Sequence, residues 1–357
     1  MTPRFIIHDT SIRAPDGTVR EHDDGYHGRG LAISWPGDVV AIDGVLLHET
    51  AWLQEHYARI GMPVAQEIVY RLSFDEATFL PKHLLDPFIF DDLANDVRPD
   101  KEWYAIVIEM NDKNATLRRA AALGVPFPQT QMFDHVLQLG DLEQYNYPLY
   151  LKLAVSFAGL GVWRCNSAEE LTVHLKNVPE GLGFQLQQAV EGTFLNVSYY
   201  AAGDGTYRRV LCTEQILEGP CHVGNGPSKF QPWTTTDPLA AYMASHGMRG
   251  YFAFDVVVLP DGRFLLIECN PRWNGSCYPT EVGKRLNQTN WEARGYKTLR
   301  RLDQFDLKGF EYNPSARSGV IVLNLGQLAK FHKVSLMLAG TKEQIAALAR
   351  RLPEILE

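Results

Sequence analysis

The residues best suited to chemistry are Asp255, Glu268 and Asn270, which lie in two apolar runs separated by Pro260-Asp-Gly262. Glu268 and Asn270 are two positions apart, so on a strand their side chains share one face. The Pro-Asp-Gly turn predicts a hairpin, in which Asp255 meets the other two across the ladder. Carboxylate and amide oxygens suit Mg²⁺, so the pattern predicts a magnesium site. The alternative is a hairpin edge with a solvated polar face.

Three cationic side chains could accompany such a metal. Arg272 follows the hairpin, and its planar guanidinium could hold a phosphoryl or carboxylate oxygen in a bidentate manner. Lys152 lies inside an apolar run that predicts a strand, and a loop with Gly159 and Gly161 follows it. Glycines let backbone N–H groups approach phosphate oxygens closely. Lys113 lies near the start of a predicted helix, the end that attracts anions. Surface lysines and an ordinary turn are the alternatives.

The residues named above lie in or next to strands and helices that are predicted for the central part of the chain. The central part contains predicted strands at 150–155, 184–190, 195–201, 208–214, 252–259 and 264–269, and predicted helices at 111–124, 169–176 and 239–247. The loop at 219–227 is predicted to be long and irregular.

The two ends of the chain show fewer signals. The first hundred residues predict strands at 5–7, 39–42 and 103–108 and helices at 49–61 and 80–91. The tail from about residue 301 predicts strands at 319–325 and 334–338. A final helix at 341–352 begins with a capping-box pattern of Thr341 and Gln344.

Several motifs, taken in order, resemble the ATP-grasp superfamily over about residues 109–285. The hairpin ending in Glu268-Cys-Asn270-Pro-Arg272 resembles the metal-binding strands of that superfamily. The segments that resemble its two ATP-binding lysines, its glycine-rich loop and its adenine hinge are Asn111-Asp-Lys113, Leu151-Lys152-Leu153, Ser156-Phe-Ala-Gly159-Leu-Gly161 and Gln187-Gln188-Ala189-Val190-Glu191-Gly192.

The resemblance implies a mixed α+β and α/β fold with three parts. Residues 1–108 would form an N-terminal α/β domain of the pre-ATP-grasp type. Residues 109–300 would form the ATP-grasp domain, with lobes at about 109–182 and 183–300 that sandwich ATP. Residues 301–357 would form a small C-terminal α+β extension.

The resemblance also implies roles for individual residues. ATP would contact Lys113, Lys152, Gly159, Gly161, Gln188, Ala189, Val190, and either Glu191 or Asn196 at the ribose. The metal, Mg²⁺ or Mn²⁺, would be held by Asp255, Glu268 and Asn270. The catalytic residues would be Arg272 and Lys152, and the substrates would contact Gly275, Ser276, His222 and Asn225. For His222, a loop position without a catalytic role is the alternative.

The function implied is an ADP-forming carboxylate–amine ligase, which activates a small carboxylate as an acyl phosphate and joins it to an amine such as an amino acid. A small-molecule kinase, a ligase with a non-amine acceptor and a non-catalytic ATP-binding protein are the alternatives. A homodimer is the default expectation for oligomeric state.

Composition narrows the classes of partner. The 357 residues carry 34 Lys and Arg against 42 Asp and Glu, a formal net charge of −8, which disfavours nucleic acid as a partner. Five cysteines without a C-x-x-C spacing disfavour a disulfide framework or a zinc site. No apolar run reaches the roughly 20 residues of a membrane helix. These features predict a cytoplasmic protein without a membrane partner.

Overall fold

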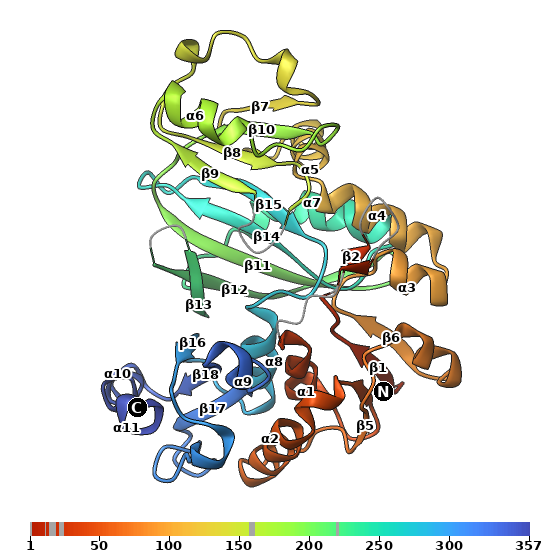
Figure 1. The fold of residues 1–357 in the computed structure, drawn as a ribbon, viewed down its shortest axis with the longest axis vertical. Helices are drawn as coiled ribbons and strands as arrows, with labels where there is room; N and C mark the ends of the chain where they lie inside the picture. Colours follow the sequence, from red (N-terminus) through yellow and green to blue (C-terminus); the bar gives the residue numbers. More distant parts are fainter. Residues whose placement is uncertain (1, 11, 14–18, 21–24, 157–160, 219–220) are drawn as a thin grey trace. The chain divides into compact units, whose positions relative to one another are not determined.

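The computed structural model describes residues 2–10, 12–13, 19–20, 25–156, 161–218 and 221–357 (Figure 1). The chain divides into two compact units, and each is described by itself. The first unit comprises Met1–Tyr104, Gln215–Pro227 and Arg272–Glu357, and the second comprises Ala105–Glu214 and Ser228–Pro271. The division of the sequence at residues 108 and 300 stays a prediction.

The first unit contains a parallel sheet of four strands in the order β5-β4-β1-β6 (Figure 1). Central strand β1 pairs with both β4 and β6, so its side chains Phe5, Ile6 and Ile7 are fully buried. The bounds of the strands are Arg4–Ile7 for β1, Val39–Ala41 for β4, Glu67–Val69 for β5 and Leu84–Pro87 for β6. A short separate pair is formed by β2 (Ile12–Arg13) and β3 (Val19–Arg20).

Helices separate these strands along the sequence and follow the last of them. They are η1 (Tyr26–Arg29), α1 (Gly30–Ile33), η2 (Gly44–Leu46), α2 (Leu47–Arg59), η3 (Phe74–Phe79), α3 (Asp92–Val97) and α4 (Lys101–Asn111), the last of which continues into the second unit. The predicted helix at 49–61 is confirmed as α2.

Four antiparallel-paired segments complete the first unit, in the order β13-β16-β18-β17. Their bounds are Cys221–Pro227 for β13, Trp291–Lys297 for β16, Gly319–Asn324 for β17 and Lys333–Ala339 for β18. The accompanying helices are α8 (Cys277–Arg285), η6 (Leu302–Gln304), α9 (Leu328–Phe331), α10 (Lys342–Arg351) and α11 (Pro353–Leu356). The capping box is confirmed, because Thr341 and Gln344 bond each other's backbone N–H groups at the start of α10.

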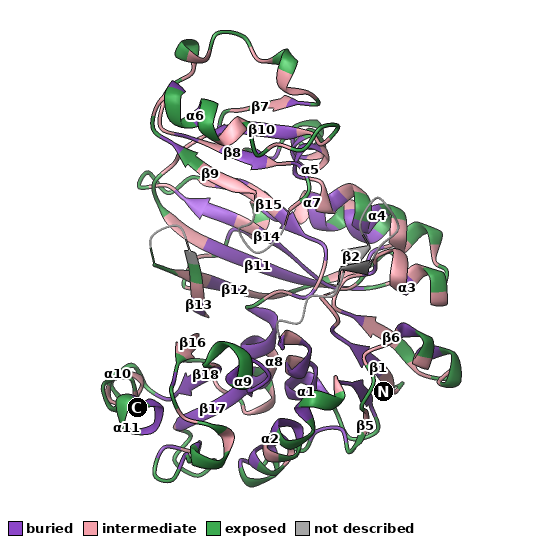
Figure 2. Cartoon of the chain, viewed as in Figure 1, coloured by how far each residue is buried: buried purple, intermediate pink, exposed green. Residues whose placement is uncertain are grey.

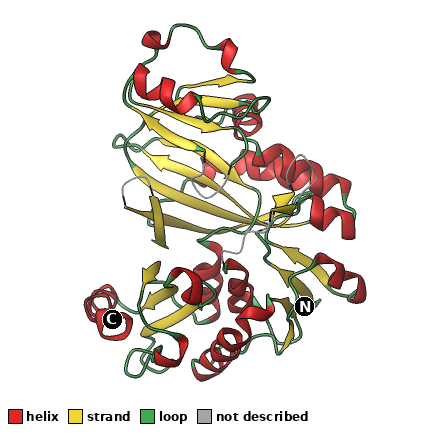
Figure 3. Cartoon of the chain, viewed as in Figure 1, coloured by secondary structure: helices red, strands yellow, loops and turns green. Residues whose placement is uncertain are grey.

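The second unit contains an antiparallel sheet in the order β7-β10-β8-β9, drawn in yellow at one end of the unit (Figure 3). The strands are β7 (Thr130–Phe133), β8 (Leu149–Leu153), β9 (Val162–Cys165) and β10 (Phe184–Gln188). One face packs on an apolar cluster that includes Leu151, Phe184 and Leu186. Lys152, Gln185 and Gln187 alternate with these residues, so they belong to the opposite face. Helices α5 (Lys113–Ala122), η4 (Val136–Gln138), η5 (Leu142–Gln144) and α6 (Ala168–Leu175) accompany the sheet.

A second set of long strands holds the predicted hairpin, in the order β15-β14-β11-β12. Their bounds are Thr193–Ala202 for β11, Tyr207–Glu218 for β12, Arg249–Val258 for β14 and Phe264–Asn270 for β15. Most residues of the middle strands β11 and β14 are buried (Figure 2). Helix α7 (Trp233–Ser245) packs against β11 and β15. The hairpin turn forms as predicted, with Gly262 in the left-handed region at a φ of 85°.

Three predictions of secondary structure were wrong. Residues 103–108 belong to helix α4, because a short apolar run suits a strand and a buried helix equally, and Asp100 caps this helix by accepting from the Trp103 N–H. Residues 80–91 contain strand β6 rather than a helix. The loop predicted at 219–227 is strand β13 from residue 221 onward, and residues 219–220 lie outside the described residues.

Among the described residues, no helix is both long enough and apolar enough to cross a membrane.

Candidate active site

The hairpin brings the three predicted metal ligands together in the second unit. Asp255 on β14 lies directly opposite Glu268 on β15, and Asn270 is two residues farther along β15. The Asn270 amide donates to Asp255 Oδ2 at 3.1 Å. Cys269, between the two β15 residues, points to the other face, where its thiol lies 3.8 Å from the Met243 sulfur. The Cys269 thiol is therefore packed in the protein interior.

Asp255 is a buried carboxylate with an unusual proton affinity. Burial and the neighbouring Glu268 carboxylate raise the pKa of Asp255 to about 7, against the hydrogen bonds it accepts from Asn196 and Asn270. Two carboxylates that lie opposite each other on neighbouring strands repel each other when both are ionised. A cation between them would relieve that repulsion, so the pair fits a metal ion.

The first lysine lies beside this pair. Lys113 is the first residue of α5, which begins there because the Asp112 side chain accepts from the Ala115 N–H. Its ammonium lies 3.5 Å from Glu268 Oε2 and donates to Ser156 Oγ at 3.0 Å. The side chain is only 6% exposed, so it is not a surface lysine.

The second lysine lies on β8. Lys152 donates to Gln187 Oε1 at 2.7 Å, and both side chains are buried. Burial lowers the pKa of Lys152 to about 8, with Glu268 and Asp255 opposing that effect and Lys113 adding to it. A buried lysine with one neutral hydrogen-bond partner is suited to an anionic ligand, because the ligand would restore its proton affinity.

The donor set defines the kind of metal that fits. Within the described part of the chain, no three His, Cys, Asp or Glu side chains are grouped closely enough to hold an ion. A metal here would have two carboxylates and one amide from the protein, which suits Mg²⁺ completed by water and phosphate oxygens. Asn270 directs its nitrogen toward Asp255, so its amide must turn for the oxygen to act as a ligand.

The predicted adenine hinge follows β10. The Ala189 N–H donates to the Pro148 carbonyl at 3.1 Å, which also accepts from the Gln188 side-chain amide at 2.9 Å. The Ala189 N–H is therefore used within the protein, while Val190 is half-buried and Glu191 is exposed in the turn before β11.

Asn196, one of two predicted ribose contacts, lies beside Asp255, one of the predicted metal ligands. Its amide nitrogen donates to Asp255 Oδ1 at 2.8 Å, and its amide oxygen accepts from Ser198 at 3.0 Å. Of the predicted glycines, Gly161 has a φ of 73°, and a Cβ there would lie 2.7 Å from the Leu153 side chain. Gly159 lies outside the described residues.

The remaining predicted residues belong to the first unit. His222 Nε2 lies 2.8 Å from Asn225 Oδ1, and a Cβ on Gly275 would lie 3.5 Å from the His222 ring, so these three residues are neighbours. Burial lowers the pKa of His222. Ser276 bonds to Asn274 through its Oγ at 2.8 Å.

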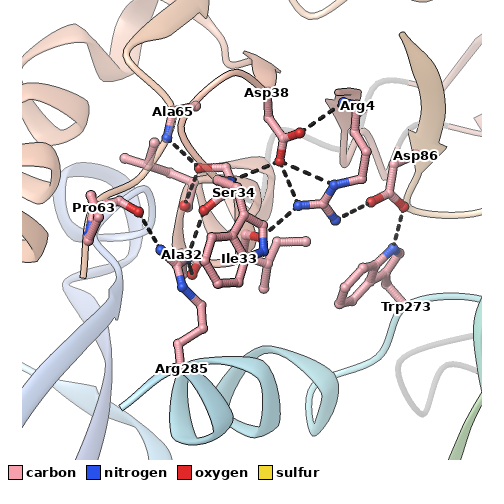
Figure 4. Close-up of polar contacts among 12 residues, drawn as sticks. Arg4, Ala32, Ile33, Ser34, Asp38, Pro63, Ala65, Asp86, Trp273 and Arg285 are labelled. Carbon is pink, nitrogen blue, oxygen red and sulfur yellow. Dashed lines mark hydrogen bonds and ion pairs between the residues drawn. The ribbon is translucent and has the colours of Figure 1, made fainter. Parts of the chain in front are cut away.

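Arg272 is positioned by the residue after it. The Trp273 N–H donates to the Phe88 carbonyl at 3.1 Å, and the indole N–H donates to Asp86 Oδ1 at 2.8 Å. Figure 4 shows the Asp86 carboxylate between this indole and the guanidinium of Arg4. The segment that carries Arg272 is thereby attached to strand β6 of the parallel sheet.

Sequence reasoning did not identify Gln187 and Ser156 as partners of the two lysines. Gln187 had a usable signal, since Gln185 and Gln187 alternate with apolar residues in a predicted strand and so share a face with a lysine-bearing neighbour. Ser156 had none beyond its place in the predicted loop.

Comparison with solved structures defines the class: the chain has the ATP-grasp fold, with a parallel N-terminal sheet and antiparallel sheets, as predicted. It is similar to N5-carboxyaminoimidazole synthetase from Staphylococcus aureus complexed with ADP, with a TM-score of 0.64 and 11% identity over 100% of this chain and 97% of that one. No protein-family model and no curated protein sequence matches the chain.

Two further structures show the same fold. Carboxyaminoimidazole ribonucleotide synthase from Aspergillus clavatus complexed with ATP has a TM-score of 0.60 and 12% identity, covering 99% of this chain and 98% of that one. L-amino acid ligase from Bacillus licheniformis has a TM-score of 0.55 and 13% identity, covering 85% and 94%. Identities this low establish the fold and leave the reaction to be argued from the site.

Proposed function

We propose that this protein is an ATP-dependent, ADP-forming ligase that activates a small carboxylate as an acyl phosphate and joins it to an amine. The observation that supports the proposal most strongly is the cluster of Asp255, Glu268, Lys113 and Lys152 in the second unit. Paired carboxylates beside buried lysines match the needs of a metal-bound polyphosphate. The structures of similar fold that contain ADP and ATP support the choice of nucleotide.

Each charged residue has a proposed role. Asp255, Glu268 and Asn270 hold Mg²⁺ or Mn²⁺, which when bound neutralises charge on phosphate oxygens. Lys113 and Lys152 bind the phosphates, with Ser156 and Gln187 orienting their ammonium groups.

Further contacts with ATP and the substrates follow the same proposal. Gln188, Ala189, Val190 and Glu191 line the adenine and ribose, and Gly159 and Gly161 cover the phosphates. Arg272 binds the acyl phosphate as charge develops on it. His222, Asn225, Gly275 and Ser276 contact the carboxylate or the amine. The three-domain division at residues 108 and 300 belongs to this proposal.

A second candidate is ATP-dependent carboxylation of an amine. It is favoured by the name N5-carboxyaminoimidazole synthetase, which describes a carboxyl group on an amine nitrogen, and by the match to that protein along the whole chain. Both candidate reactions use ATP to form a carbon–nitrogen bond. They differ in the acid that is activated, which is an organic carboxylate in the first and bicarbonate in the second.

The test is ADP release by the purified protein with Mg²⁺, ATP and pools of organic acids or bicarbonate, each with and without pools of amines. We expect ADP release that requires both an acid and an amine, and mass spectrometry of the mixture identifies the product. Release with bicarbonate alone as the acid would select the second candidate. ADP release that needs no amine would indicate a kinase, and ATP binding without ADP release from any pool would indicate a non-catalytic protein.

A further inference from the structure

The parallel sheet of the first unit has a point where its strand order reverses. From β1 the chain proceeds outward through β4 to β5, and then returns to place β6 on the other side of β1. In open parallel sheets, ligands bind beyond the carboxyl ends of the strands at such a reversal. Here the residues at that place are His8, which follows β1, and Phe88, which follows β6.

Arg29, in the connection between β1 and α1, is a cation without an acidic partner in the described part of the chain. Its guanidinium lies over the rings of Tyr26, at 4.1 Å, and Tyr278, at 4.5 Å. Among the described residues, its Nε donates to the Tyr26 carbonyl at 3.2 Å. The terminal amino groups of this half-buried guanidinium are therefore oriented by two rings and not used by a carboxylate.

The contrast with Arg4, on the same sheet, is direct. Arg4 forms ion pairs with Asp38 at 2.7 Å and Asp86 at 2.9 Å and also donates to the Ile33 carbonyl (Figure 4). Asp38 and Asp86 are thus paired with Arg4. Arg29 forms no such ion pair among the described residues, so its guanidinium is free to meet an anionic ligand.

His8 adds a buried polar atom that lacks a partner. The side chain is 1% exposed, and its Nδ1 lies 2.8 Å from the Tyr278 hydroxyl, while its Nε2 has no hydrogen bond to any of the described residues. The ring packs on Trp273, with centroids 5.2 Å apart, and on Tyr278 at 5.5 Å. When the Tyr278 hydroxyl donates to Nδ1 of the neutral ring, Nε2 carries the proton and can donate a hydrogen bond to a ligand.

Tyr278 joins these two residues, because it lies under the Arg29 guanidinium and bonds to His8. We infer that Arg29 and His8 form a binding site for the oxyanion of a small substrate, a carboxylate or a phosphate, at the carboxyl end of β1. A guanidinium fork recognises either group in a bidentate manner. The inference rests on the proposed function only in treating the ligand as the substrate to be activated or to accept the acyl group.

The test follows the His8 ring directly. The full chain is labelled with ¹⁵N-histidine and titrated with inorganic phosphate or with acetate, and the Nε2 signal of His8 is assigned with His8→Gln. We expect a saturable shift of that signal in the natural protein and in Arg71→Gln, a control at an exposed arginine of the same unit, and no shift in Arg29→Gln. The anion that saturates at lower concentration identifies the group. An unmoved His8 signal with both anions, or an equal shift in Arg29→Gln, would overturn the inference.

A second variant and a kinetic measurement protect the test against misfolding. Arg29→Lys keeps the charge but loses the fork, so we expect it to fold and to bind the anion more weakly. With an active acid and amine pair, Arg29→Gln should raise the KM of one of these substrates about 10- to 100-fold and leave the KM of ATP unchanged. Equal KM values would count against the site. The titration contains no ATP, so absence of ADP release would refute the proposed function and leave this result standing.

Discussion

Replacing Glu268 with Gln is the sharpest test of the cluster in the second unit. The change keeps the size of the side chain and removes one charge that three groups depend on. Lys113 loses a carboxylate at 3.5 Å, Lys152 loses the neighbour that most raises its pKa, and Asp255 loses the neighbouring charge that raises its own. A metal at this position would lose one of two charged ligands.

The size of the effect can be worked from the distance. Two unit charges 3.5 Å apart interact by about 5 kcal/mol at an effective dielectric constant of about 20. Because Glu268 is 28% exposed, water screens part of this, and the value is an upper bound. At about 1.4 kcal/mol per tenfold change, the bound corresponds to between three and four powers of ten. Removal of a single electrostatic contact to the transition state, such as an oxyanion-hole donor, lowers kcat by about 10²- to 10³-fold in other enzymes, and we expect a loss of that order here.

The assay is ADP release coupled to a spectroscopic signal, at saturating ATP and over a range of Mg²⁺ concentrations. Glu180→Gln, at an exposed position of the same unit, is the matched control and should behave as the natural protein. We expect Glu268→Gln to lose kcat and to need more Mg²⁺ for half-maximal rate. A variant with near-natural kcat at natural Mg²⁺ concentrations would refute the assignment of these carboxylates.

Three further outcomes follow from single contacts. Burial lowers the pKa of Lys152 to about 8, so its charge is lost above that pH and the Kd of ATP should rise as the pH increases past about 8. Lys152→Arg should keep its affinity for ATP at that pH, because arginine stays charged. An equal rise in the Kd of both proteins would contradict the phosphate-binding role of Lys152. Burial lowers the pKa of His56, whose Nδ1 lies 2.7 Å from Glu311, so the folded state favours the neutral ring. Stability should therefore fall as the pH drops below about 6.5, and His56→Gln should show a smaller fall in melting temperature; an equal fall in both proteins would contradict this role of His56. Trp273→Phe removes the indole donor to the half-buried Asp86 and should lower the free energy of unfolding by about 1–3 kcal/mol in urea titrations, where an unchanged value would show that this bond is unimportant.

The hairpin that brings Asp255, Glu268 and Asn270 together was predictable because most of its information is local. The turn, the apolar runs and the two-residue spacing of Glu268 and Asn270 lie within one short segment. The exact pairing was not local, because continuing the register of the turn would set Asp255 opposite Ile267, and a register shift between Asp255 and Val256 sets it opposite Glu268 instead. The first lysine was different, because its distance to Glu268 depends on the packing of α5 against β15, and only the family resemblance indicated it.

The first unit was less predictable because its contacts join distant parts of the chain. Strand β13 pairs with β16, whose residues are more than sixty positions later, and nothing local marks either partner. The same holds for Arg29 and His8, which meet through Tyr278, about 250 positions farther along the sequence. A histidine after a buried strand and an arginine between two glycines have no distinctive spacing, so only the fold brings them together.

The net charge of −8 describes the whole chain and conceals how the site is balanced. In the second unit the cations Lys113 and Lys152 face the carboxylates of Asp255 and Glu268, so the cluster compensates itself when no ligand is bound. A polyphosphate that bound alone would draw the lysines away from these carboxylates and leave two acids facing each other. A metal that bound alone would neutralise the acids and leave two buried ammonium groups without counter-charge. Only metal and polyphosphate together preserve the balance, so each should strengthen the binding of the other by the same factor.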